Sequence, residues 1–384
     1  MTNDPRTASP TPIPIKRSGS MNAIKIVFAV LAALVAFLLG LIVLFLIGVE
    51  TGPVALMIGL VSATVPVPLY LILVLWIDRY EAEPAWMLAT AFFWGALVAV
   101  FFAFLLNTAS DLAVREMTHS VIAGRTFAAV ISAPIVEESA KALILFIFFF
   151  WKKDEFDGVI DGIVYAAMVG LGFAMTENIQ YYGRAVVEAG GRLTDVFILR
   201  GALAPFSHPM FTSLTGIGLG LARQSANSAI KWIAPVLGLL AAISMHSIWN
   251  GSGVLFGDVA FILTYIVVMI PAFFIMLTVI ILALRREGQI VREYLVGDYK
   301  GGLLTQQEYD RLCTIRGRMG SSLNALSRGG FSHWQAVRQL NQTASELAFH
   351  RSRIARGIIA ADAQEREAAY QRALQDLLRR MRTN

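Results

Sequence analysis

Residues 131–150 read ISAPIVEESAKALILFIFFF, an almost wholly apolar run that nevertheless holds Glu137, Glu138 and Lys141. The run is long enough to cross the hydrocarbon core of a bilayer, which takes about 20 helical residues. A charge near the middle of a bilayer costs roughly 2.5 to 3.5 kcal/mol, so charged side chains at that depth usually contact one another and serve a function. This run therefore predicts a membrane helix that carries a functional site.

The composition of the whole chain agrees with a membrane protein, because 56% of its 384 residues are hydrophobic and only 15% are charged. A soluble domain of this size does not need so much apolar surface. The expected fold class is all-α, a polytopic integral membrane bundle of about eight transmembrane helices with a cytoplasmic helical tail. The predicted spans are 24–49, 53–77, 86–106, 127–151, 158–183, 202–222, 232–251 and 259–284.

The distribution of Lys and Arg predicts the orientation, since these residues collect in the short loops on the cytoplasmic side. The bias places both termini in the cytoplasm of a multi-pass cell-membrane protein, with Arg115, Arg184, Arg192 and Arg200 on the outer side. We expect a disordered leader at 1–22, a transmembrane domain at 23–285 and a cytoplasmic helical region at 286–384. The net charge of +5 reflects this orientation and not nucleic-acid binding, because the basic residues form no patches interleaved with aromatics.

The polar region at 286–384 contains sequence patterns that predict helices. Thr305 and Glu308 have the spacing of a helix capping box, and apolar residues recur at helical intervals further on, which predicts two or three amphipathic helices. His333 and His350 are expected to be surface residues. The single cysteine, Cys313, excludes an intrachain disulfide and does not indicate redox chemistry.

Four more polar residues interrupt the later spans. They are Glu177, His208, His246 and Asn250. Residues four apart share a helix face, so Glu137 lies beside Lys141 and His246 beside Asn250. The lysine can neutralise one glutamate and leave the other free for proton transfer or metal binding.

Depth in the bilayer provides an independent test. Glu138 lies 13 residues from Trp151, Glu177 lies 19 from Gly158, His208 lies 15 from Arg223, and His246 lies 14 from Trp232. At 1.5 Å per residue these separations are about 20 to 28 Å from the cytoplasmic face. All four side chains therefore fall in the outer half of the bilayer, which predicts a single cluster.

Two mechanisms follow from carboxylates and imidazoles in one hydrated pocket. In the first, His208, His246 and a glutamate (Glu138 or Glu177) bind a divalent metal such as zinc, and another glutamate acts as the general base. In the second, a glutamate activates water without a metal, while His246 and Asn250 stabilise the oxyanion. Both mechanisms hydrolyse a peptide bond, and the residues do not decide between them because the soluble zinc motif HExxH is absent.

Other interpretations of the same residues remain open. His208 stands between Pro205 and Pro209 and could satisfy carbonyls freed by a kinked helix, while Asn250 could tie two helices together. The whole cluster could serve a proton- or cation-coupled transporter. A scaffold without activity would leave the buried charges unexplained.

Four motifs in order carry a family resemblance. Glu137-Glu138-Ser-Ala-Lys141, Phe173-Ala-Met-Thr-Glu177-Asn178, the His208-Pro209 segment and His246-Ser-Ile-Trp-Asn250 resemble those of the PrsW family of intramembrane proteases. That family is distantly related to the CAAX prenyl-protein and bacteriocin-processing proteases. The stretch DRYEAEP at 78–84 is similar to the family's acidic Glu-Pro element, and the likeness covers about 78–250.

The resemblance implies a multi-helix membrane protease, commonly described as a metalloprotease. Its implied substrate is a membrane-anchored protein, such as an anti-sigma factor, cleaved on the extracytoplasmic side of the lipid bilayer. It also implies catalytic roles for two glutamates of the first motif and for Glu177, His208 and His246. We add Lys141 as the charge partner of the glutamates and Asn250 as an oxyanion donor or orienting residue.

Overall fold

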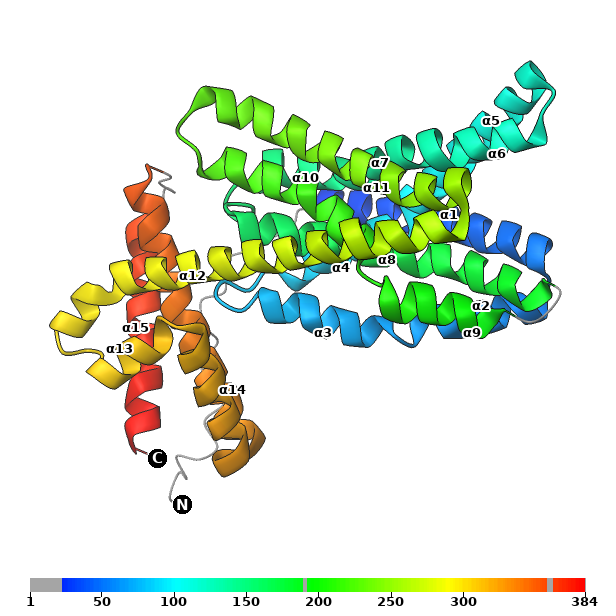
Figure 1. Ribbon diagram of the computed structural model, residues 1–384. Coiled ribbons are helices and arrows are strands. Elements are labelled where there is room, and N and C mark those ends of the chain that lie inside the picture. Colours follow the sequence, from blue (N-terminus) through cyan, green and yellow to red (C-terminus); the bar gives the residue numbers. More distant parts are fainter. Residues whose placement is uncertain (1–22, 189–191, 358–361, 384) are drawn as a thin grey trace. The chain divides into compact units, whose positions relative to one another are not determined.

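The computed structural model describes residues 23–188, 192–357 and 362–383, and within these ranges all regular structure is helical, without strands (Figure 1). The predicted class, an all-α membrane bundle, is confirmed, while the predicted leader at 1–22 lies outside the described residues. In the described residues, four short π-helical segments, labelled η, lie between α-helices. The elements are α1 (Ala23–Thr51), α2 (Pro53–Thr64), α3 (Val67–Ile77), α4 (Ala85–Phe93), η2 (Trp94–Ala99), α5 (Val100–Thr118), α6 (Val121–Phe127), η3 (Ala128–Ser132), α7 (Ala133–Trp151), α8 (Val159–Val187), α9 (Leu193–Phe197), η4 (Ile198–Leu203), α10 (Ser207–Gln224), α11 (Ser228–Thr264), η5 (Tyr265–Met269), α12 (Ile270–Lys300), α13 (Gln306–Leu312), α14 (Ile315–Ala355) and α15 (Ala363–Thr383).

Within the described residues, five helical runs are long and apolar enough to cross a membrane by length and composition. They are Ala23–Thr51, Pro53–Ile77, Ala85–Thr118, Val159–Val187 and Ser228–Lys300. The predicted spans at 127–151 and 202–222 are helical but are not among the five, and the first of them holds the three charges of α7. The last run contains two predicted spans, 232–251 and 259–284, so eight crossings stay a prediction.

Contacts divide the described chain into two compact units. The larger unit comprises Val27–Asp78 and Glu83–Ile280, and the smaller unit includes Arg79–Ala82 together with Ile281–Asn384. Helix α8 is the core of the larger unit: 94% of its most apolar 18-residue window is buried, and it packs against α2, α4, η2 and α10.

Glycines allow α8 and α10 to approach closely. A Cβ atom on Gly162 would overlap the backbone of Gly216, and one on Gly170 would lie 2.6 Å from the nitrogen of Pro209. Close backbone contact at small residues is a common way to pack membrane helices. This contact fixes the position of the residue before Pro209, which is His208.

The smaller unit is organised around the buried guanidinium of Arg318. This group donates hydrogen bonds to the carbonyls of Leu312 and Arg79 and to Oγ of Ser345, and it lies 4.2 Å from the ring centroid of Tyr80. Burial lowers the pKa of Arg318 to about 10. The loop Arg79–Ala82 is thus bound by the tail of the chain.

Two predictions about the tail have different outcomes. The capping box is confirmed: Thr305 and Glu308 form it at the start of α13, and α14 and α15 follow. His333 is exposed as expected, but His350 is not a surface residue. Its side chain is buried, with Nε2 2.8 Å from the carbonyl of Ala363, because α14 and α15 pack together at this point.

The α8–α10 contact can be tested with Gly170→Ala. The added methyl group would force the two backbones apart, so we expect a loss of about 1 to 3 kcal/mol in the free energy of unfolding in detergent. Gly297→Ala is the matched control, because a Cβ there meets nothing within 4 Å and alanine favours a helix. Equal stability of the two variants would contradict the close contact.

The single thiol can be tested by labelling. Cys313 is 5% exposed, and burial raises the pKa of its thiol to about 11, so little thiolate exists at neutral pH. We expect a thiol reagent at pH 7.5 to label the native protein at least about 100-fold more slowly than the denatured protein, with the rate rising as the pH approaches 11. Fast labelling of the folded protein would show that Cys313 is accessible and reactive.

Candidate active site

Helix α7 carries the three charged residues of the first motif on its buried side. The ammonium of Lys141 lies 2.8 Å from Oε1 of Glu138 and 3.5 Å from Oε2 of Glu137. The side chains of Lys141 and Glu138 have no exposed surface, and that of Glu137 is 7% exposed. Lys141 thus lies as a charge partner beside both glutamates, in a buried position.

Glu138 has both carboxylate oxygens engaged. Besides the contact with Lys141, Oε1 lies 3.1 Å from Nδ1 of His246 on α11, and Oε2 accepts a hydrogen bond from Oγ1 of Thr212 at 2.9 Å. A carboxylate only accepts hydrogen bonds, so Nδ1 of His246 carries the proton and Nε2 keeps a lone pair. This is the arrangement by which a carboxylate orients a histidine for metal binding or proton transfer.

Glu137 is the carboxylate that is left incompletely bonded. Its Oε1 accepts a long hydrogen bond of 3.4 Å from Nδ2 of Asn107, whereas its buried Oε2 has no hydrogen bond from any described residue. Oε2 lies 3.9 Å from Nε2 of His246. A buried carboxylate oxygen without a hydrogen bond is costly, which marks this position as a place for a ligand or a reacting molecule.

His208, near the start of α10, joins the pair on α7 to Glu177 on α8. Its Nδ1 lies 2.9 Å from Nζ of Lys141, and its Nε2 lies 2.9 Å from Oε2 of Glu177. An ammonium only donates, so Nδ1 is the acceptor and Nε2–H donates to Glu177. The rings of His208 and His246 stand nearly perpendicular, with centroids 5.1 Å apart.

Arg200 on η4 is a member of this network that sequence reasoning placed only at the outer surface. Its guanidinium pairs with Oε2 of Glu177, and its Nε lies 2.6 Å from Oδ1 of Asn178. It also lies 3.8 Å from the ring centroid of Tyr181. The sequence offered one signal for Arg200. Lys141 lies beside the glutamates of the first motif, whereas Glu177 had no cation predicted beside it.

Two smaller polar residues were also missed. Thr212 follows His208 by four residues and so shares its helix face, a spacing that would have indicated it. Asn107 on α5 accepts a hydrogen bond from Oγ of Ser132 at 2.9 Å and holds Oε1 of Glu137. Nothing in its sequence surroundings marks it.

Asn250 ties two elements together. Its Nδ2 donates to the carbonyl of Ala129 in η3 at 2.9 Å, one turn beyond His246 on α11. A π-helical segment leaves backbone groups out of the regular α-helical pattern, and such segments often occur at functional sites. The amide thus fixes α11 against the segment that leads into α7.

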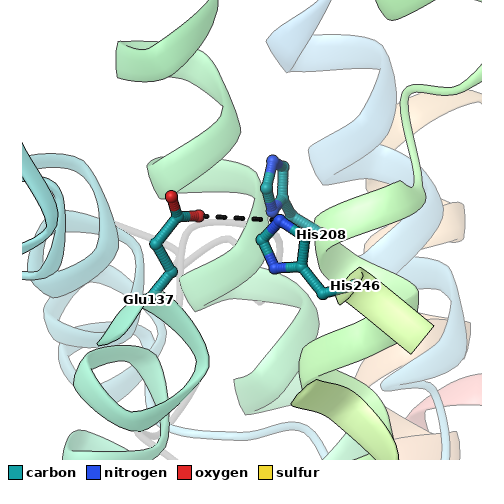
Figure 2. A group of neighbouring side chains, drawn as sticks. All are labelled: Glu137, His208 and His246. Carbon is teal, nitrogen blue, oxygen red and sulfur yellow. Dashed lines mark ion pairs between the residues drawn. The ribbon is translucent and has the colours of Figure 1, made fainter. Parts of the chain in front are cut away.

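Glu137, His208 and His246 form a potential metal-binding group, because one ligand atom from each lies within 4.8 Å of the others (Figure 2). Two imidazoles and a carboxylate are the protein ligands of many catalytic zinc sites. Oε2 of Glu137 accepts no hydrogen bond from the described residues, and Nε2 of His246 keeps its lone pair, so both atoms fit this role, whereas His208 would have to release one of its present partners. The set differs from the predicted one in that Glu137 takes the place of Glu138 and Glu177.

Comparison with known proteins adds to this geometry. A model of the PrsW family of intramembrane metalloproteases matches residues 83–276, which include all seven predicted site residues. Proteins named Protease PrsW are similar to the chain: one from Geobacillus kaustophilus is 34% identical over 146 residues, and one from Bacillus subtilis is 34% identical over 176 residues. A third, from Oceanobacillus iheyensis, is 29% identical over 194 residues.

These matches cover 38%, 45% and 50% of this chain, and 58%, 72% and 82% of the Geobacillus, Bacillus and Oceanobacillus proteins respectively. No solved structure matches the chain significantly. The family match spans half of the chain and contains the whole buried cluster of glutamates, histidines and lysine. The chain therefore belongs to the PrsW family of intramembrane metalloproteases.

Proposed function

We propose that this chain hydrolyses peptide bonds of membrane-anchored proteins inside the bilayer, with the cluster around Lys141 as its active site. Family membership supports a protease over the ion-coupled transporter that the same buried charges also allow. One observation carries the residue assignment: Oε2 of Glu137 is buried, accepts no hydrogen bond from any residue that the structure describes, and lies 3.9 Å from Nε2 of His246.

Glu137 is the general base of the proposed reaction. A water molecule can lie within hydrogen-bonding distance of both Oε2 of Glu137 and Nε2 of His246. As the water oxygen attacks the scissile carbonyl carbon, Oε2 takes its proton. The same proton then passes to the amide nitrogen as the C–N bond breaks, so Glu137 returns to the carboxylate form.

The other members of the cluster position these groups and balance charge. Glu138 holds His246 through Nδ1, and Glu177 holds His208 through Nε2. The ammonium of Lys141 is the buried cation beside the reacting groups and would stabilise the negative charge that develops on the carbonyl oxygen. Asn250 has an orienting role, because its amide fixes α11 to η3.

Glu137, His208 and His246 are the residues that would hold a divalent metal such as zinc, and with a metal bound Glu137 would be a ligand instead of the base. When bound, the metal would supply Lewis-acid polarisation of the scissile carbonyl. Glu138 and Glu177 would then act as outer partners of the two histidine ligands, a role that usually raises metal affinity.

We further propose that the protease domain occupies 23–285 and that 286–384 is a cytoplasmic region. The chain would cross the membrane several times with both termini in the cytoplasm, as the distribution of Lys and Arg favours. The cluster would lie in the outer half of the bilayer, and the family resemblance implies a membrane-anchored anti-sigma factor as the substrate.

Glu137→Gln tests the general base. The amide cannot accept the proton of the attacking water, so we expect cleavage of a single-pass test protein in liposomes to fall by about 10²- to 10⁴-fold while the protein stays folded. Glu116→Gln is the matched control, because Glu116 is exposed on α5. Cleavage at the wild-type rate by Glu137→Gln would remove the assignment.

Arg200→Gln tests whether the guanidinium that pairs with Glu177 helps to position His208. Loss of the guanidinium would free Glu177 and loosen His208, and we expect kcat to fall by about 10- to 100-fold. Arg184→Gln is the control, since Arg184 also pairs with a glutamate, Glu50, but at the exposed surface, where an ion pair contributes little. Equal activity of the two variants would show that Arg200 has no positioning role.

A further inference from the structure

A cavity of about 350 Å³ lies next to the proposed active site in the larger unit. One wall is the segment from Ala202 to Ser207 with Met210, and the other wall is formed by η5 and the start of α12. Pockets of roughly 300 Å³ and more are large enough to bind ligands. The residues of the second wall are Tyr265, Met269, Ile270, Phe273 and Phe274.

The first wall is a break in the helical structure. Segment η4 ends at Leu203, the chain turns through Ala204–Phe206, and α10 begins at Ser207. Pro205 has no N–H to continue a helix. The carbonyl of Ala204 accepts a hydrogen bond from Oγ of Ser207 at 2.9 Å. The hydroxyl of Tyr265 donates to the carbonyl of Leu203 at 2.9 Å, which joins the two walls.

The side chains that line the second wall are apolar and partly accessible. Ile270 is 37% exposed, Phe273 is 42% exposed and Phe274 is 58% exposed. Apolar side chains surround most of the space, so an apolar group would gain free energy by entering it. The volume suits large side chains and is too small for a whole helix, which is about 10 Å wide.

The cavity adjoins the proposed catalytic cluster at the start of α10. Ser207 and Met210 line the cavity, while His208, between them in the sequence, contacts Lys141 and Glu177. Arg200, two residues before the first wall begins, pairs with the same Glu177. One stretch of backbone thus separates an apolar space from the polar groups that would act on a peptide bond.

We propose that this cavity is a substrate subsite, which receives a large apolar side chain of the substrate's membrane segment close to the scissile bond. The inference rests on the proposed function and specifies its substrate class: membrane segments with Leu or Phe near the cleavage site. Because sequence neighbours of His208 line the cavity, this occupant is favoured over a lipid chain, which has no reason to bind beside the reacting groups.

The experiment compares single-pass test proteins that carry Ala, Leu or Phe at each position around the cleavage site. Wild-type protein should prefer Leu and Phe over Ala at one position. Ile270→Trp would fill the cavity and should lower the Phe-to-Ala ratio of kcat/KM by about tenfold or more, whereas Phe273→Ala would enlarge it and should retain activity toward Phe. Leu277→Trp, also on α12 but outside the cavity, should keep the wild-type ratio.

A second readout does not depend on cleavage. A photoreactive aromatic side chain at the preferred position should crosslink to Phe273 or Phe274 in the Glu137→Gln variant. Crosslinking without any cleavage by the wild-type protein would support the subsite and contradict the proposed function. Cleavage with an unchanged side-chain preference in both cavity variants, and no crosslink, would overturn the subsite alone and is the result expected if the cavity holds lipid.

Discussion

The ammonium of Lys141 has no exposed surface, and it contacts carboxylates of its own helix, an imidazole from α10 and the ring of Phe173 at 3.9 Å. A charge in such surroundings is tolerated only when it is paired and hydrogen-bonded. The requirement draws four helices together: α7 provides the lysine and two glutamates, α8 provides Glu177, α10 provides His208, and α11 provides His246. Convergence of these helices is thus a condition for burying the charge, and it also produces the geometry of the candidate active site.

Backbone packing makes this convergence possible. Glycines of α8 and α10 let the two helices touch without side chains between them, so that Glu177 and His208 meet at hydrogen-bonding distance. Segments η3 and η4, which immediately precede α7 and the turn before α10, interrupt the regular helical pattern beside the site. Asn250 and Tyr265 donate hydrogen bonds to carbonyls in these two segments, so the irregular backbone is satisfied by side chains of later elements.

The polar cluster and the apolar cavity lie against one short stretch of chain, and this arrangement relates the fold to intramembrane proteolysis. A peptide bond in a membrane helix is shielded by its neighbours, so an enzyme needs both a hydrated polar site and an apolar surface for the adjacent side chains. The start of α10 presents both: His208 contacts the cluster, and Ser207 and Met210 line the cavity. The tail is a separate compact unit built on a buried arginine, and it holds the loop Arg79–Ala82, which ends one residue before the family match begins at residue 83.

The amino-acid sequence by itself determined the helical membrane class and the placement of charges in apolar segments, and it predicted that Glu138, Glu177, His208 and His246 cluster, because these depend on hydrophobicity, helical period and rise per residue. Only the tertiary structure decided which carboxylate keeps an oxygen without a hydrogen bond. Glu137 and Glu138 are adjacent in sequence, but Thr212 and His246 bond to Glu138, whereas Oε2 of Glu137 accepts no hydrogen bond from the described residues. The tertiary structure also decided that Arg200 pairs with Glu177 and that His350 is buried. Helical periodicity specifies which residues share a face, whereas hydrogen-bond partners depend on how separate helices cross, and local sequence does not encode that crossing.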